Sequence, residues 1–222
     1  MHRRALLIPG AAAAAVAAAL LLTSSGTGAG AAPVRASASP AAGSALIGPY
    51  ASRYQSEASG PVAHATLSRV ASDPRLLAAV RSGSDARVRS HVAGEFPAVW
   101  YHWHVSRLRI TRGSKTIVET GVPFVVDGPS TALRDAHGHA IARLQISIQD
   151  VIGFVRLNKR LDHVATVVRG LGSADVRASL PAALEVRLPS SGTVKIAGRR
   201  YTVGSFHEIG WRGEPLHIWI LK

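Results

Sequence analysis

Residues Thr131–Asp150 read TALRDAHGHAIARLQISIQD, a pattern typical of two strands joined by a tight turn. The turn falls at Ala136-His137-Gly138, and a longer strand returns after it. Successive side chains of a strand point to opposite faces. The returning strand therefore has an apolar face and a polar face, formed by Leu144, Ile146 and Ile148 and by Arg143, Gln145 and Ser147. We expect the apolar face to pack in the core and the polar face to border whatever the protein binds.

The N-terminus has the pattern of an export signal. Arg3 and Arg4 precede an apolar run, Ala5–Leu22, and small residues at 29–31 form a cleavage site. This predicts a signal peptide over residues 1–31 and a secreted or extracytoplasmic protein. An uncleaved signal anchor is the alternative, because the run is close to the shortest that spans a bilayer. Residues 32–48 are rich in Ala, Ser and Pro and predict a disordered linker.

The composition is basic, with 26 Lys and Arg against 13 Asp and Glu among 222 residues. The arginines are scattered singly with few aromatics among them, which argues against a nucleic-acid partner. The functional interpretation of the positive charge is attraction to an anionic cell envelope. The alternative is that the chain is generally rich in Arg and Ala, without a functional reason. The chain has no cysteine, so it has neither disulfides nor a lipidation site.

The order of predicted elements indicates an α+β fold. Helices are predicted over residues 49–71, after the Ser72-Asp73-Pro74 start signal, and from 84–85 to before Pro97. Strands follow at 107–111, 115–119 and 123–126, then the opening hairpin and a helix capped by Asp150. The remainder reads as β-structure, clearest in GTVKIAGRRYTVGSFHEIG and LHIWIL. We therefore predict one domain over residues 49–162, with a C-terminal β extension at 163–222 packed on it.

Three segments carry a resemblance to a known family: LSRVASDPRLLAAVRSGSDARVRSHV, RLRITRGSKTIVET and LRDAHGHAIARLQISI. In this order they are similar to Cache-type (PAS-like) extracytoplasmic sensor domains, over about residues 60–160. The closing segments GRRYTVGSF and PLHIWIL resemble the last strands of double-Cache domains. The resemblance implies N-terminal helices packed on one face of a curved antiparallel sheet, and a small-ligand pocket on the other.

The resemblance also implies candidate ligand-binding residues. In relatives that sense citrate-like carboxylates, a basic residue begins the second strand after the turn, and Lys115 holds that place. This chain has Val118 where those relatives have His, and Gly128 and Ser130 where they have cations. A tricarboxylate is therefore not expected. A single carboxylate or a polar neutral molecule fits the remaining set: Lys115, Ser130, Thr131, Arg143, Gln145 and Ser147. The alternative is that Lys115 and Arg143 are solvated surface residues.

Histidines supply the metal candidates. On a strand, His102 and His104 would point to the same face, the arrangement of a common zinc or copper pair. The alternative is an aromatic segment joining helices to sheet, or a ligand lid, because Trp and Tyr residues interleave with them. His137 and His139 flank a turn glycine and are expected at a solvated hairpin tip. His207-Glu208 and His217 belong to the closing strands.

Motifs for catalysis are missing from the sequence: there is no Gly-x-Ser-x-Gly, Ser-x-x-Lys, His-Glu-x-x-His or Cys nucleophile. We therefore predict that the protein is not an enzyme and that it binds no cofactor. The leading hypothesis is an exported small-ligand-binding domain without its own transmembrane output module, so that any signal passes through a partner protein. The competing hypothesis is an envelope-associated interaction protein that reuses the fold with its pocket filled by side chains.

Overall fold

The structure, a computed structural model, describes residues 40–222, so the predicted signal peptide and residues 32–39 of the predicted linker lie outside the described residues. The structure differs from the linker prediction at residues 40–48, because helix α1 spans Pro40–Ser59. Helices this long are stabilised chiefly by packing, and α1 buries Tyr50 and Tyr54 against the C-terminal sheet. Within residues 40–222, no helix is long and apolar enough to cross a membrane.

Three further helices precede the first sheet. The last two lie where the sequence predicted them, but the single helix predicted over residues 49–71 is divided at Gly60, because Pro61 begins a new helix. The three helices are α2 (Pro61–Ala71), α3 (Pro74–Arg81) and α4 (Asp85–Glu95). Asp73 caps α3 by accepting hydrogen bonds from the amides of Arg75 and Leu76 at 2.8 and 3.2 Å. Ser84 caps α4 by accepting one from the amide of Arg87 at 3.3 Å. A π-helical turn, η1 (Phe96–Trp100), and a 3₁₀ turn, η2 (Tyr101–Trp103), lead from α4 toward the sheet.

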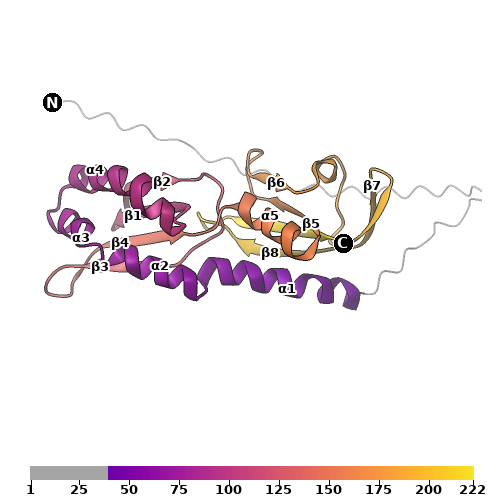
Figure 1. The fold of residues 1–222 in the computed structure, drawn as a ribbon, viewed down its shortest axis with the longest axis horizontal. Helices are drawn as coiled ribbons and strands as arrows, with labels where there is room; N and C mark the ends of the chain where they lie inside the picture. The colour runs from indigo at the N-terminus through magenta and orange to yellow at the C-terminus, as the bar shows by residue number, and fades with distance from the viewer. Residues whose placement is uncertain (1–39) are drawn as a thin grey trace, which may run out of the picture. The chain divides into compact units, whose positions relative to one another are not determined.

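The first sheet is antiparallel, with strand order β2-β1-β4-β3 (Figure 1). Its strands are β1 (Arg107–Arg112), β2 (Lys115–Gly121), β3 (Ser130–Arg134) and β4 (Ala140–Ser147). The β3–β4 pair is the hairpin predicted from Thr131–Asp150. Asp135 fixes its turn by accepting hydrogen bonds from the amides of His137 and His139 at 2.8 and 2.9 Å. The predicted strand at 123–126 forms only isolated bridges, Val125 to Asp150 and Val126 to Gly210.

The two faces of β4 divide as the alternation predicted. Leu144 and Ile146 are fully buried in a core formed with the helices, and Ile148 packs against its edge. The helices contribute Leu67, Val70, Leu76, Val80, Val88 and Val92 to that core. Arg143 and Gln145 lie on the opposite face. The α2–α4 helices therefore cover one face of this sheet and leave the other to polar side chains.

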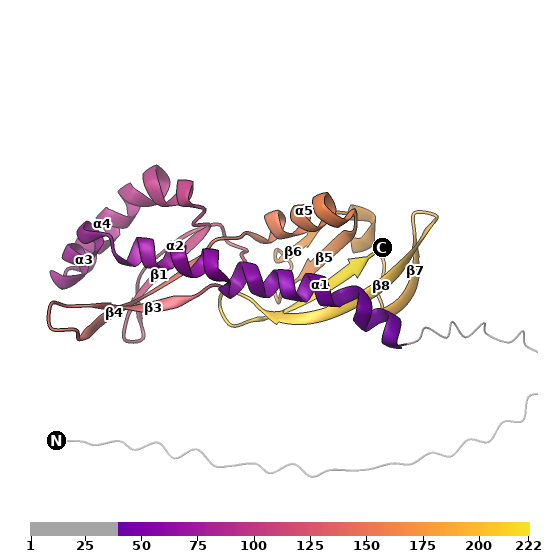
Figure 2. The same ribbon diagram turned by 60° about the horizontal axis from the view of Figure 1, so that its bottom comes forward.

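The C-terminal strands form a second, separate antiparallel sheet. Its elements are α5 (Val151–Asp162), β5 (Ala165–Arg169), β6 (Val176–Ala178), η3 (Pro181–Leu184), β7 (Ser191–Ile196), β8 (Arg199–Ile209) and β9 (Pro215–Leu221). The strand order is β6-β5-β9-β8-β7. Asp150 caps α5 through the amide of Gly153, as predicted. We assigned α5 to the first domain, but it packs on this second sheet together with α1 (Figure 2).

Both sheets share one order of connections. In each sheet, the first strand lies between the second strand and the last strand. The second sheet carries one additional strand, β7, at its far edge. The described chain is therefore an α+β protein with two sheets of related topology, each covered on one face by helices.

Candidate functional site

The polar face of the first sheet carries a row of side chains that crosses all four strands. Strand pairing aligns Glu119 of β2 with Arg109 of β1, Arg109 with Gln145 of β4, and Gln145 with Ser130 of β3. Residues directly opposite each other in an antiparallel pair share a face and lie close enough to interact. The row therefore places a carboxylate, a guanidinium, an amide and a hydroxyl side by side.

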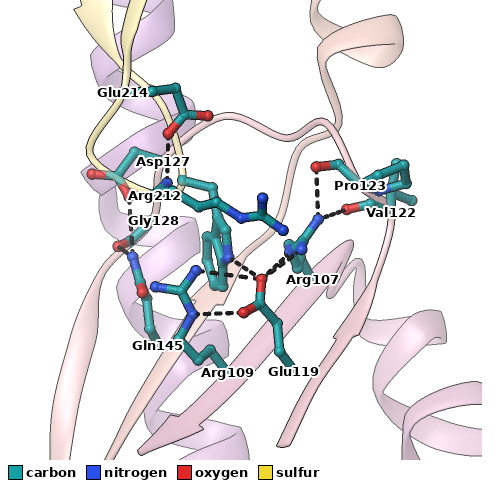
Figure 3. A network of polar contacts seen from close by, with 11 residues as sticks. Arg107, Arg109, Glu119, Val122, Pro123, Asp127, Gly128, Gln145, Arg212 and Glu214 are labelled. Atoms are coloured by element: carbon teal, nitrogen blue, oxygen red, sulfur yellow. Dashed lines mark hydrogen bonds and ion pairs between the residues drawn. The ribbon is translucent and has the colours of Figure 1, made fainter. Parts of the chain in front are cut away.

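Glu119 is the centre of a network at one end of this row (Figure 3). Its Oε1 accepts hydrogen bonds from Arg107 Nε at 2.8 Å and Nη2 at 2.5 Å, and its Oε2 accepts one from Arg109 Nε at 3.0 Å. Trp211 Nε1 donates to Oε1 at 3.0 Å. Arg107 also donates to the carbonyls of Val122 and Pro123 at 2.7 and 2.6 Å. We call Arg107, Arg109, Glu119 and Trp211 the Glu119 network.

The electrostatics of the network keep Glu119 ionised. Burial alone would raise the pKa of Glu119, but hydrogen bonds from Arg109, Arg107 and Trp211 outweigh burial and lower the pKa to about 2. Hydrogen bonds between charged partners are shorter and stronger than those between neutral ones. At neutral pH the network is therefore a fixed set of charges that satisfy one another.

Trp211 brings the C-terminal sheet onto this face. It follows β8 in the loop before β9, and its side chain is only 3% exposed. The Arg109 and Arg107 guanidinium carbons lie 5.1 and 5.8 Å from its ring centroid, within cation–π range. This part of the face, which the resemblance implied to be a pocket, is thus filled by a side chain of the protein itself.

Gln145 belongs to the adjoining contacts. Its Nε2 donates to Asp127 Oδ1 at 3.1 Å and approaches the Gly128 carbonyl at 3.5 Å (Figure 3). Burial raises the pKa of Asp127. The amide of Gln145 therefore holds the segment before β3 rather than facing open space.

Three of the six predicted ligand-binding residues line one hollow on the same face. This hollow has a volume of about 440 Å³, and we call it the Arg143 hollow. The residues along it include Thr111, Arg112, Ser130, Thr131 and Arg143. Arg143 Nε and Nη2 donate to Ser130 Oγ at 3.0 and 2.5 Å. Within residues 40–222, no carboxylate lies within ion-pair distance of Arg143.

Lys115 and Ser147 lie elsewhere. Lys115 Nζ forms an ion pair with Asp85 Oδ2 at 2.7 Å, and its side chain is 70% exposed. The hydrogen bond from Lys115 lowers the pKa of Asp85. The Ser147 hydroxyl is fully buried and donates to the Val126 carbonyl at 2.7 Å. The structure therefore does not bring these two residues to the Arg143 hollow.

The strand expected for His102 and His104 is not present. Both residues lie in or just after the 3₁₀ turn η2, and His104 has a left-handed backbone with φ of 64°. The chain turns here because fully buried Trp100 is anchored in the helical core, while Trp103 stacks 3.6 Å from the Arg69 guanidinium. Both histidines border a hollow with Gln149 and Asp150. Among residues 40–222, no three His, Asp or Glu side chains are grouped as metal ligands.

His139, His207 and His217 lie at the hairpin tip and in the closing strands, as the sequence predicted. His139 contacts Asp135 at the β3–β4 hairpin tip, with Nδ1 3.3 Å from Oδ2. His207 and His217 are direct neighbours on β8 and β9, and their rings stack at 4.1 Å. Burial lowers the pKa of His217, and the charges of His207 and Arg169 lower it further.

The Glu119 network is what sequence reasoning missed. Period-2 alternation in the predicted strand 107–111 places Arg107 and Arg109 on one face, and Arg112-Gly113-Ser114 forms the turn to the next strand. Continuing the pairing from that turn would bring Val118 opposite Arg109. A bulge between Ile110 and Thr111 shifts the register and places Glu119 there instead. Strand periodicity does not predict that bulge, so the pairing of Glu119 with Arg109 could not be read from the sequence. The approach of Trp211 could not be read from it either, because a distance of 92 residues along the chain separates it from Glu119.

Comparison with known proteins supports the fold. No family model and no curated protein matches the sequence. Among solved structures, the periplasmic domain of Vibrio cholerae LuxQ is similar, with 12% identity and a TM-score of 0.50 over 83% of this chain and 99% of that chain. A selenomethionine structure of the LuxQ periplasmic domain gives a TM-score of 0.47 at 12% identity, over 83% of this chain and 98% of that one. This chain thus has an α+β fold like that of the periplasmic domain of LuxQ.

Proposed function

We propose that this protein is an extracytoplasmic, sensor-like domain that binds a small monocarboxylate or polar molecule in the Arg143 hollow, and that it is not an enzyme. The observation that carries the proposal is the environment of the Arg143 side chain. Its guanidinium borders a hollow, is oriented by Ser130, and has no carboxylate partner within residues 40–222. The likeness to a periplasmic domain and the signal-like N-terminus support the location.

The chemistry of the hollow suits one carboxylate. A guanidinium presents paired donors to a carboxylate, and charge-assisted hydrogen bonds are about twice as strong as neutral ones. Thr111 and Ser130 share the face of Arg143, and their hydroxyls supply neutral donors and acceptors beside it. Arg112 also lines the hollow, but its guanidinium is directed to the helices, where it pairs with Asp85 at 2.6 Å and donates to the Gly83 carbonyl at 3.1 Å. One unpaired cation therefore favours a singly charged ligand over a tricarboxylate.

A thermal-shift titration of the purified protein with acetate, pyruvate and glycine tests this proposal. A ligand at 100 times its Kd stabilises the folded state by about 2.7 kcal/mol, so saturation raises the Tm measurably. We expect at least one of these probes to raise the Tm, and Arg143→Gln to abolish the increase. Arg87→Gln, which removes an exposed arginine on α4, is the matched control and should keep it. If no probe raises the Tm, the small-carboxylate proposal is contradicted.

The second candidate function is recognition of a partner protein by an envelope-associated domain with a filled pocket. The specific observation in its favour is that Trp211 occupies the face beside Arg107 and Arg109. This candidate predicts that the small carboxylates leave the Tm of the wild-type protein unchanged, and that they leave the Tm of the Arg143→Gln variant unchanged as well. The same titration therefore separates the two candidates.

The extracytoplasmic location has its own test. Alkaline phosphatase folds only after export, so a fusion of residues 1–39 to a signal-less alkaline phosphatase should be active in bacterial cells. Replacing Leu20, Leu21 and Leu22 by Asp should abolish that activity, because the apolar run is what directs export. An inactive wild-type fusion would contradict export.

A further inference from the structure

A second hollow lies at the end of the C-terminal sheet, away from the Glu119 network. It has a volume of about 190 Å³, and its polar lining comes from Lys159, His163, Ser179, Arg199, Tyr201 and Lys222. No aspartate or glutamate side chain lines it. We call it the basic hollow.

Separate elements bring the basic side chains together. Lys159 lies in the last turn of α5, and Arg199 begins β8 directly after the turn at Ala197-Gly198. Lys222 is held in place because its backbone pairs with Thr202, with N–O distances of 2.8 and 2.9 Å. Lys159 and Lys222, which are 63 positions apart in the sequence, therefore border the same small hollow.

No aspartate or glutamate side chain within residues 40–222 compensates the basic side chains of the hollow. Lys159, Arg199 and Lys222 form no ion pair within residues 40–222. The acid that ends α5, Asp162, is instead paired with Arg53 at 2.6 Å. Like charges brought together repel one another, and an anion between them removes that repulsion.

The remaining lining groups suit an oxyanion. The Arg199 guanidinium carbon lies 5.5 Å from the centroid of the Tyr201 ring, a cation–π contact that orients it. Ser179 and Tyr201 add hydroxyl groups at the border. Three cations and neighbouring hydroxyls match a group with several oxygens and more than one negative charge better than they match a single carboxylate.

We propose that the basic hollow is a binding site for a phosphate group. Such a group can come from an anionic phospholipid headgroup or from a soluble phosphate ester. The start of helix α1 and the C-terminal residue Lys222 lie at the same side of the folded region (Figure 2). The apolar run Ala5–Leu22 precedes α1 by residues 23–39 in the sequence. If this run is retained as a signal anchor, a membrane surface is one source of headgroups. The site is independent of the Arg143 hollow.

The test compares two triple variants of the full chain. The site variant carries Lys159→Gln, Arg199→Gln and Lys222→Gln. The control variant carries Arg75→Gln, Arg87→Gln and Arg89→Gln on α3 and α4, and loses the same charge. Co-sedimentation with vesicles of phosphatidylglycerol and phosphatidylcholine, against phosphatidylcholine alone, measures the lipid source. Calorimetric titration with inorganic phosphate and glycerol 3-phosphate measures the soluble source.

We expect the site variant to bind at least about tenfold more weakly, and the control variant to stay within about threefold of the wild type. Binding only to anionic vesicles identifies a headgroup, and binding of the soluble esters as well identifies a free phosphate. The proposal is overturned if the wild-type protein binds neither, or if both triple variants weaken binding equally, since net charge would then explain the result.

Chemical labelling of the wild-type protein keeps the test valid if the site variant fails to fold. Acetylation of lysines is measured by mass spectrometry with and without anionic vesicles or glycerol 3-phosphate. We expect the ligand to protect Lys159 and Lys222 and to leave exposed Lys115 unprotected. Equal labelling of Lys159 and Lys222 in both conditions would also overturn the proposal.

Discussion

At the residue scale, Glu119 is the side chain that joins the charged groups on the polar face of the first sheet. It joins two guanidinium groups and an indole, and the side chain of Arg107 is only 8% exposed. Removing one partner of a buried pair leaves the other without compensation, which costs more than the pair itself contributes. The network is therefore expected to fail as a unit when Glu119 loses its charge.

We predict that Glu119→Gln lowers the free energy of unfolding by about 2–4 kcal/mol at pH 7, because Arg107 and Arg109 lose their counter-charge. Urea denaturation of the purified protein measures this difference. Glu185→Gln, which changes an exposed carboxylate, is the control and should stay within about 0.5 kcal/mol of the wild type. A loss as small as the control's would show that the network contributes little.

The pH dependence of stability follows from the same residue. Because the folded-state pKa of Glu119 is lowered from the usual 4.5 to about 2, its contribution is complete above about pH 4.5 and is lost as the pH falls toward about 2. The difference in unfolding free energy between wild type and Glu119→Gln should therefore shrink across that window. Denaturation curves recorded at several pH values check this, and a difference that stays constant with pH would contradict the role of ionised Glu119.

At the element scale, strand β4 tests the assignment of the two faces. Ile146 is fully buried beneath α2–α4, so Ile146→Ala should lower the free energy of unfolding by about 2–5 kcal/mol. Arg143→Ala on the opposite face should change it by about 0.5 kcal/mol or less. Equilibrium denaturation of both variants measures the contrast. Equal losses would mean that β4 does not separate a core face from a surface face.

Local elements were predictable where local chemistry decides them. Asp73, Ser84 and Asp150 cap the helices that the sequence predicted, and period-2 alternation identified the β3–β4 hairpin. The prediction failed at residues 101–104, where the fixed positions of Trp100 and Trp103 override the strand pattern. It also failed at residues 40–48, where packing stabilises a helix in an Ala/Ser/Pro-rich stretch.

The candidate site was predictable only in part. Ser130 and Arg143 lie on the same face of paired strands, so the hairpin alone brings them together. The pairing of Thr131 with Leu144 puts the Thr131 side chain on the other face. Lys115 was assigned from the resemblance, but Asp85 of α4 attracts it, and helix-to-strand contacts are not encoded in strand periodicity. Ser147 follows the alternation, but its hydroxyl is covered by the segment around Val126. Long-range contacts therefore determine the positions of Lys115 and Ser147, which lie away from the Arg143 hollow.

At the scale of the whole molecule, the two sheets are joined by more than the chain that connects them. Helix α1 packs on the second sheet and α2 packs on the first. Trp211, from the loop between β8 and β9, donates to Glu119 on the first sheet. The shared order of strands in the two sheets was not visible as a sequence repeat. We expect the described region to unfold as one cooperative unit.

We predict that Trp211→Ala lowers the free energy of unfolding by about 3–5 kcal/mol and separates the unfolding of the two sheets. Trp211→Phe keeps the ring against the arginines but loses the Nε1 donor, so it should cost less. Hydrogen exchange of β1–β4 and β5–β9 as a function of urea measures the coupling. If both sheets still exchange in a single step in Trp211→Ala, the tryptophan does not couple them.

Arg143 is the residue that we propose to bind a small carboxylate. Its Nε–H resonance, assigned by comparison with Arg143→Gln, reports directly on this contact in a titration with acetate, pyruvate and glycine. We predict a saturable shift of the Arg143 Nε–H signal with at least one of these ligands, while the Nε–H signals of Arg107 and Arg109 stay unchanged. An Arg143 signal that does not move with any of them would contradict binding of a small carboxylate at this residue.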